Sequence, residues 1–140
     1  MPLLANSTDG AVTRKRLETW VAKEEKVTVV AATDAATTQS AATLAAAGHV
    51  VYTMTPTTGR ALTTPTGAEL GAAFTDEAVG TSFEFTVVNV AATTHAITLT
   101  AGASGVTLGG VAGMATIAAA SSASFLAVFT AANTVTIYRK

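Results

Sequence analysis

From residue 80 to the end of the chain, apolar and polar residues alternate with the period of two that is typical of β-strands. The stretch SFEFTVV places Phe83 and Phe85 on one side of a strand. The stretch SFLAVFT does the same with Phe125 and Phe129. These spacings predict strands that bury one phenylalanine-bearing face in a common core.

Other short segments are rich in β-branched residues and are separated by turn signals. They are KVTVVAAT, HVVYTM, HAITLTAG, GVTL, MATIA and TVTIY. Many short strands without long helical patterns predict a mainly β chain, folded as an antiparallel β-sandwich or barrel. A mixed α and β fold is the alternative.

Two segments carry helix signals. Thr64 is a candidate N-cap, Pro65 a first helical residue and Glu69 an acid in the first turn, so a short helix is expected to run to about Phe74. Residues 34–48 are rich in alanine but also contain threonine and serine, which disfavour helix. A loop with one helical turn is expected there.

The charges gather near the N-terminus. TRKRLETWVAKEEK, residues 13–26, places an apolar stripe at the i, i+3, i+4 spacing of one helical face. Two interpretations stay open: a solvated helix packed on its own domain, or an arm, short helix or extended, that docks on a partner. The second divides the chain into an arm, residues 1–26, and a β body, residues 27–140. The candidate partner-binding residues are Arg14, Lys15, Arg16, Leu17, Trp20 and Val21.

The rest of the chain is poor in charge. After Glu84 the next charged residue is Arg139, so 54 residues carry no formal charge apart from His95. Small β-sandwiches usually guard their surface and edges with charges. Leu126 and Val128 occupy positions opposite the phenylalanine face, which indicates that part of this surface is buried against other copies or another protein. A surface kept wet by threonine and serine hydroxyls is the alternative. The predicted core and oligomer residues are Phe83, Phe85, Phe125, Leu126, Val128 and Phe129.

The sequence contains no recognisable group of catalytic or metal-binding residues. His49 and His95 stand at strand starts without a second ligand at metal spacing. The adjacent carboxylates of Asp76 and Glu77 point apart and are expected in a solvated loop. The chain has no cysteine and a net charge of −1, which argues against thiolate metal sites and against bulk attraction to nucleic acid. We expect no enzyme, no metal, no cofactor, no nucleic-acid partner, no membrane segment and no signal peptide.

The C-terminal half resembles small alanine-, threonine- and glycine-rich virion proteins of tailed bacteriophages, which decorate or cement capsids or form head fibres. The similar stretches are LTTPTGAELGAAF, VGTSFEFTVVN, AITLTAGASGVTL, ATIAAASSASFLAVFT and TVTIYRK. Within them a capped helix leads into a phenylalanine strand, a glycine-rich hairpin, a small-residue strand and a closing strand. The similarity covers residues 62–140.

This resemblance implies a β-sandwich or jelly-roll-like module, commonly a homotrimer, on the outer surface of the capsid. The implied partner is the major capsid protein, and the implied role is to stabilise the shell after assembly in the host cytoplasm. A head- or tail-fibre or baseplate module that contacts the host is the alternative. A surface-layer or secreted adhesion module is a further one, against which the missing signal peptide counts.

Overall fold

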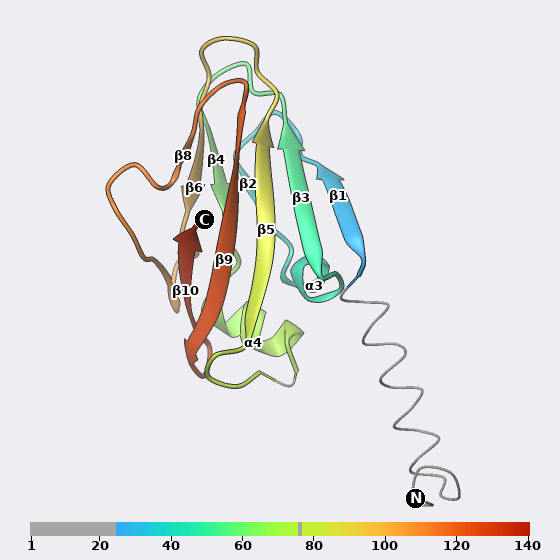
Figure 1. The fold of residues 1–140 in the computed structure, drawn as a ribbon, viewed down its shortest axis with the longest axis vertical. Helices are drawn as coiled ribbons and strands as arrows, with labels where there is room; N and C mark the ends of the chain where they lie inside the picture. The colour runs from blue at the N-terminus through green and yellow to red at the C-terminus, as the bar shows by residue number, and fades with distance from the viewer. Residues whose placement is uncertain (1–24, 76) are drawn as a thin grey trace, which may run out of the picture.

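The strands of the chain are divided between two sheets. The computed structural model describes residues 25–75 and 77–140. The larger sheet has the order β1 (Val27–Ala31), β3 (His49–Met54), β5 (Ser82–Asn89), β9 (Ser121–Ala131), β10 (Thr134–Arg139) and β7 (Val106–Leu108). The smaller sheet has the order β2 (Thr37–Thr38), β4 (Arg60–Thr63), β6 (Ile97–Thr100) and β8 (Thr116–Ile117). Figure 1 shows the larger sheet toward the viewer, with the smaller one behind it. The predicted mainly β, sandwich-like fold is confirmed.

The strand directions differ from the prediction. Five of the eight strand pairings are parallel, and three are antiparallel. From β1 to β9, each strand lies in the other sheet from the strand before it. From β1 to β6 the chain returns to each sheet after two crossings and runs in its earlier direction, which makes the pairs of β1 with β3, β3 with β5, β2 with β4 and β4 with β6 parallel. The expected hairpin of AITLTAGASGVTL is wrong for the same reason, because β6 and β7 belong to different sheets.

The core lies between the sheets and is centred on aromatic pairs. Phe85 of β5 and Phe125 of β9 are partners in the ladder, and their rings stack with centroids 5.2 Å apart. Phe83 and Phe129 pack with Phe74, whose ring lies 4.7 Å from Phe83 and 5.7 Å from Phe129. All four phenylalanines of β5 and β9 are buried, as predicted. Burying each one stabilises the fold by about 2–3 kcal/mol.

A buried asparagine joins the two sheets at the end of β5. The Asn89 side chain donates to the carbonyl of His95 at 2.7 Å and to that of Ile117 at 3.0 Å. Its oxygen accepts the N–H of Ala91 at 3.1 Å. These bonds satisfy a polar group that would be costly to bury without partners.

Two short helices close one end of the sandwich (Figure 1). The helix α3 (Ala41–Ala45) is the single turn expected within residues 34–48, and the Ser40 side chain caps it. The helix α4 (Gly67–Ala73) begins two residues later than predicted. Its N-cap is Thr66, which forms a reciprocal capping box with Glu69. The hydrogen bonds from Thr66 hold the pKa of Glu69 below its usual value. The strands β2 and β4 were not predicted; they have two and four residues.

Gly67 lets α4 contact two loops of the sandwich. Its N–H donates to the carbonyl of Ser104 at 2.9 Å. A Cβ atom at this position would meet the carbonyl oxygen of Asn133 at 1.9 Å and that of Gly105 at 2.7 Å. The close approach of backbone to backbone therefore requires glycine here.

A surface ion pair ties the segment after β1 to β4. The Asp34 carboxylate accepts from Nε of Arg60 at 2.6 Å and from the N–H and hydroxyl of Thr57. The hydrogen bond from Arg60, followed by those from Thr57, holds the pKa of Asp34 well below its usual value. Asp34 is therefore charged at neutral pH, and it anchors the loop that leads from the first strand into the second sheet.

Gly67→Ala is expected to destabilise the protein by about 1–3 kcal/mol, because α4 or the β9–β10 turn must move to accommodate the methyl group. Urea denaturation monitored by circular dichroism measures this change. Gly59→Ala is the matched control, since the nearest atom to its added Cβ is 4.0 Å away. Equal stability of the two variants would contradict the close packing at Gly67.

Asp34→Asn is expected to lower the free energy of unfolding at pH 7, and the difference from wild type should shrink below about pH 4. The folded-state pKa of Asp34 is depressed. As the pH falls through about 3.9, the pKa of an aspartate in the unfolded chain, the unfolded state therefore binds more protons than the folded state. The stabilising contribution is complete above about pH 4 and is lost progressively as the pH falls from there toward the depressed folded-state pKa, so part of it is lost at pH 3. Urea denaturation at pH 7 and pH 3 measures both differences. With Glu25→Gln, an exposed carboxylate, as control, a pH-independent effect of Asp34→Asn would refute the assignment.

Candidate functional site

The predicted partner-binding residues of the arm lie outside the described residues. They are Arg14, Lys15, Arg16, Leu17, Trp20 and Val21. The structure describes the chain from Glu25 onward, two residues before β1. The division into an arm and a β body therefore stays a prediction.

The predicted core and oligomer residues fall into two groups. Phe83, Phe85, Phe125 and Phe129 are buried between the sheets. Leu126 and Val128 alternate with the phenylalanines of β9 and are half-buried on the opposite side of the sheet. The expectation that these two side chains do not share the phenylalanine core is confirmed.

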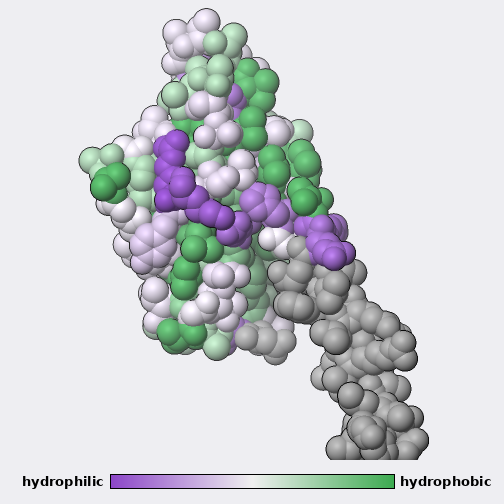
Figure 2. Space-filling view, in the orientation of Figure 1, coloured by the Kyte–Doolittle hydropathy of each residue, from purple (hydrophilic) through white to green (hydrophobic). Residues whose placement is uncertain are grey.

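We call this opposite side of the six-stranded sheet the outer face. Ladder registers assign it three apolar groups of residues. They are Val27 and Val29 on β1, Val51 on β3 with Val88 on β5, and Leu126, Val128 and Tyr138 on β9 and β10. Val27 is 59% exposed, Val29 66% and Tyr138 43%. Figure 2 shows apolar surface over β1 and over the lower part of β9, with a hydrophilic band between them.

The outward side of the four-stranded sheet has a different composition. Its six positions hold five threonines and one alanine, in two rows across the strands. They are Thr38, Thr63 and Thr100 in one row, and Ala61, Thr98 and Thr116 in the other. Threonine presents a hydroxyl to water from a side chain that fits a pleated sheet. The described body therefore has one face suited to water and one face that carries valine, leucine and tyrosine.

A polar network forms the hydrophilic band of the outer face. Nζ of Lys140 lies 2.8 Å from Glu84, whose other oxygen is 3.8 Å from Nδ1 of His49. Nε2 of His49 is 2.8 Å from the hydroxyl of Thr86, which is 2.8 Å from the hydroxyl of Ser124. The network crosses β3, β5 and β9 and pairs the acid with the base, so it adds no net charge.

Hydroxyl, imidazole and carboxylate follow one another here as they do in serine hydrolases. Three details argue for a surface network instead. The Thr86 hydroxyl is shared with Ser124, and the 3.8 Å contact of His49 with Glu84 is longer than a hydrogen bond. The residues also lie on the outward side of the six-stranded sheet, where the side chains of His49 and Glu84 are 29% and 37% exposed.

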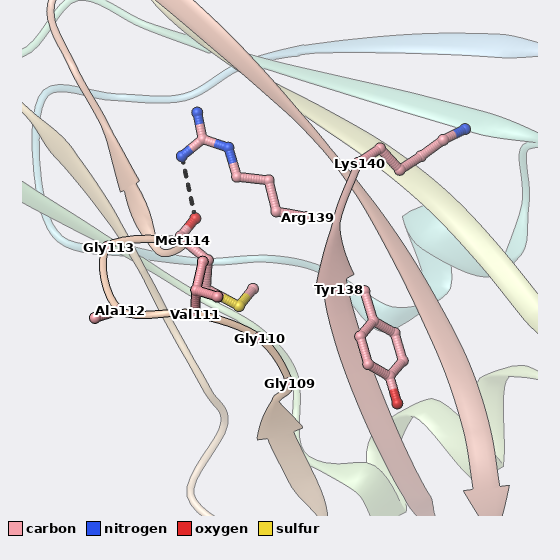
Figure 3. Close-up of a pocket in the computed structure, with 9 residues that line it drawn as sticks. All are labelled: Gly109, Gly110, Val111, Ala112, Gly113, Met114, Tyr138, Arg139 and Lys140. Carbon is pink, nitrogen blue, oxygen red and sulfur yellow. Dashed lines mark hydrogen bonds between the residues drawn. The ribbon is translucent and has the colours of Figure 1, made fainter.

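A hollow of about 530 Å³ lies where β10 extends past β7. Gly109–Met114 form one wall, and Tyr138, Arg139 and Lys140 form the other (Figure 3). Nη1 of Arg139 donates to the carbonyls of Met114 at 3.2 Å and Thr116 at 2.8 Å. The guanidinium thereby fixes the glycine-rich loop and ties β10 to β8 in the other sheet.

The remaining candidate groups are not brought together. Nε2 of His95 lies 3.3 Å from the hydroxyl of the adjacent Thr94. Glu77 accepts the N–H of Asn133 at 3.3 Å, while Asp76 lies outside the described residues. Within residues 25–75 and 77–140, no three histidine, cysteine or acidic side chains gather as a metal site would require. No helix in this part of the chain has the length and hydrophobicity to span a membrane.

Sequence reasoning missed the apolar edge strand and the threonine face. VTVVA predicted a strand, but nothing in five residues indicates that β1 lies at a sheet edge, where Val27 and Val29 remain exposed. The threonine face depends on β2 and β4, which are too short for a periodic signal. The sequence signal that could have indicated the threonine face is the pair of motifs ALT and TLT, each of which has a buried leucine between two outward residues.

Comparisons of the chain with protein-family models, with curated protein sequences and with solved structures return no match.

Proposed function

We propose that this chain is a structural virion protein that binds the outside of a bacteriophage capsid and stabilises it. Its partner is the major capsid protein, and the chain acts as a homotrimer on the outer surface of the virion. The observation that carries the proposal is the contrast between the two faces of the sandwich. A threonine face suits solvent, while the outer face combines exposed valines with Leu126, Val128 and Tyr138.

The architecture supports a mechanical role. A decoration protein must be rigid and must span the joints between capsid subunits without performing chemistry. Two sheets tied by Asn89 and Arg139 give the body that rigidity. The basic and aromatic residues of the arm, Arg14 to Trp20, supply a separate adhesive segment in this proposal. The body then forms the trimer, and the arm holds the capsid.

A fibre or baseplate module that contacts the host is the second candidate. Exposed Tyr138 beside the hollow favours it, because an aromatic ring at a surface recess can stack on a sugar or a peptide. Tyr52 does not contribute to such a site, since it is 3% exposed and its burial raises the pKa of Tyr52 to about 12. A single described surface tyrosine is a small platform, so we favour the capsid-binding role.

Deleting residues 1–22 is expected to abolish capsid binding while leaving the β body folded and its oligomer intact. The deleted segment carries three of the eight basic residues of the chain and its one tryptophan, which are the adhesive groups of the arm in this proposal. Occupancy is measured by mixing the protein with expanded capsids of the source phage, sedimenting them and quantifying the bound chain.

The control for this deletion is Thr98→Lys/Thr100→Lys, which changes the threonine face and keeps the arm. It should bind capsids as wild type does. Unchanged occupancy after the deletion would refute the arm assignment. Binding of the full chain to host cells, without binding to capsids, would replace the decoration role with the fibre role.

A further inference from the structure

The strand β10 continues beyond the end of its neighbour β7, and the hollow lies at this step in the sheet (Figure 3). The parallel ladder between the two strands ends with Leu108 opposite Ile137, whereas β10 runs on to Arg139. The chain leaves β7 at Gly109 and forms the far wall of the hollow. The last two residues of β10 therefore have β9 on one side and the hollow on the other.

The main-chain groups of Arg139 point toward the hollow. Along a strand these groups alternate between the two neighbouring strands. The carbonyl of Ile137 accepts the N–H of Gly109 at 2.8 Å on the β7 side, and the N–H of Lys140 donates to the carbonyl of Ser124 at 2.9 Å on the β9 side. Arg139 stands two residues after Ile137, so its N–H and C=O point to the β7 side, where the ladder has ended. Within residues 25–75 and 77–140, neither group has a main-chain partner.

The guanidinium of Arg139 brings a positive charge to the same place. Its Nη1 is held by the carbonyls of Met114 and Thr116, which leaves the N–H groups of Nε and Nη2 as further donors. The adjacent Lys140 is neutralised by Glu84 at 2.8 Å. Arg139 itself has no ion pair in the described part of the chain. A carboxylate is the group that the planar guanidinium binds best.

An aromatic wall and an exposed valine border these polar groups. The ring of Tyr138 packs along Gly109, where an added Cβ would stand 2.8 Å from Cε1 of the ring. The ring is thereby fixed in place, although Tyr138 is 43% exposed. Val111, on the wall opposite β10, is 81% exposed (Figure 3). The hollow thus offers an open strand edge, a cation and apolar surface within one recess.

We infer that the hollow binds an extended acidic peptide segment of a partner protein, added as a short antiparallel strand beside Arg139. One peptide residue exchanges two main-chain hydrogen bonds with Arg139, as in other domains that add a peptide strand to an open sheet edge. Paired residues of a ladder place their side chains on the same face. A glutamate opposite Arg139 therefore meets the guanidinium.

The residues that flank this glutamate complete the recognition. Their side chains point to the opposite face of the added strand, which is the face of Tyr138, so apolar residues are favoured there. The preferred segment is apolar, glutamate, apolar. A sugar acid could use the guanidinium and the ring, but it would leave the main-chain groups of Arg139 unpaired. The inference goes beyond the capsid role, because the site lies on the β body and uses no residue of the arm.

Hydrogen exchange at Arg139 tests the added strand directly. The probe is the pentapeptide Thr-Val-Glu-Val-Thr, acetylated and amidated so that it has no terminal charges. It is titrated into the ¹⁵N-labelled full chain and is expected to bind with a dissociation constant below about 1 mM. At saturation the amide of Arg139 should exchange about tenfold more slowly or less. The amide of Val79, an exposed residue outside the hollow, should not change.

Two altered peptides separate the contacts. The peptide with glutamine in place of glutamate should bind about fivefold more weakly, because a charge-assisted hydrogen bond is replaced by a neutral one. The peptide that is N-methylated at the glutamate should no longer slow exchange at Arg139, because it cannot donate to the Arg139 carbonyl and its methyl group blocks the pairing.

Variants of the protein test the charge. Arg139→Gln should bind the glutamate and glutamine peptides equally, and circular dichroism verifies that it folds. Val111→Glu keeps Arg139 and its bonds to the loop; it should weaken binding of the glutamate peptide more than binding of the glutamine peptide. Val79→Glu is the matched control, because it adds the same charge at a valine that is 75% exposed and does not line the hollow. It should bind both peptides as wild type does.

Three results would overturn the inference: unchanged exchange at Arg139 with the peptide at several times 1 mM, equal affinity of wild type for the two peptides, or binding of glucuronic acid without binding of the peptide. The proposed function fails separately. A protein that binds the peptide and leaves capsids unoccupied refutes the capsid role alone. A protein that occupies capsids and does not bind the peptide refutes this site alone.

Discussion

The antiparallel ladder between β5 and β9 holds the molecule together. On one side of it, β1, β3 and β5 are parallel strands reached by successive crossings; on the other side, β9 and β10 form a hairpin that carries β7 at its edge. The ladder runs from Ser82 opposite Val128 to Asn89 opposite Ser121, and Phe85 stacks on Phe125 within it. The two halves of the large sheet share no other strand pairing among the described residues, so this ladder also determines the shape of the outer face. It places the phenylalanines of both strands toward the small sheet, and it places Glu84, Thr86, Ser124 and Leu126 outward.

The difference between the two outward faces follows from how each sheet is built. The four-stranded sheet consists of segments of two to four residues whose outward positions are almost all threonine. Most strands of the six-stranded sheet are longer, and its outward positions hold Val27 and Val29 on β1 and Leu126, Val128 and Tyr138 on β9 and β10. A solvated sheet gains nothing from leucine over threonine, whereas a sheet in an interface gains about 25 cal/mol for each Å² of apolar surface that it buries. The uneven use of the two residue types therefore indicates that the two faces have different surroundings.

The sequence predicted the elements that have their own periodicity. HVVYTM is a strand from His49 to Met54 as expected, and the alternation around Phe83 and Phe125 gave both the strands and their buried faces. The helix near residue 70 was also predicted, but its cap was assigned to Thr64. Pro65 suits a first helical position, yet the reciprocal hydrogen bonds between Thr66 and Glu69 are what begin the helix.

Strand direction was not predictable, because alternation indicates which face of a strand is buried and does not indicate which strand lies beside another. The outer face could be predicted only in part. Leu126 and Val128 were identified because they alternate with the phenylalanines of the same strand, whereas the exposure of Val27 and Val29 depends on the position of β1 at the sheet edge.

The long uncharged run is explained by the positions it occupies. Residues 85–138 supply β6 to β10 and most of β5, so they fill both sheets as well as the loops between them. Inward positions exclude charge because they are buried, and the threonine face needs none to remain hydrated. The outward positions of β9 and β10 are the ones where lysine or glutamate would be tolerated in a monomer and would guard the sheet against association. Those positions hold Ser122, Ser124, Leu126 and Val128 on β9, and Thr136 and Tyr138 on β10. The charges of the face are instead confined to Glu84 on the central strand and Lys140 beyond the end of β10, which are paired with each other. Among the described residues, charge is thus missing from the outward positions of β9 and β10 and is present, neutralised, on the central strand of the sheet.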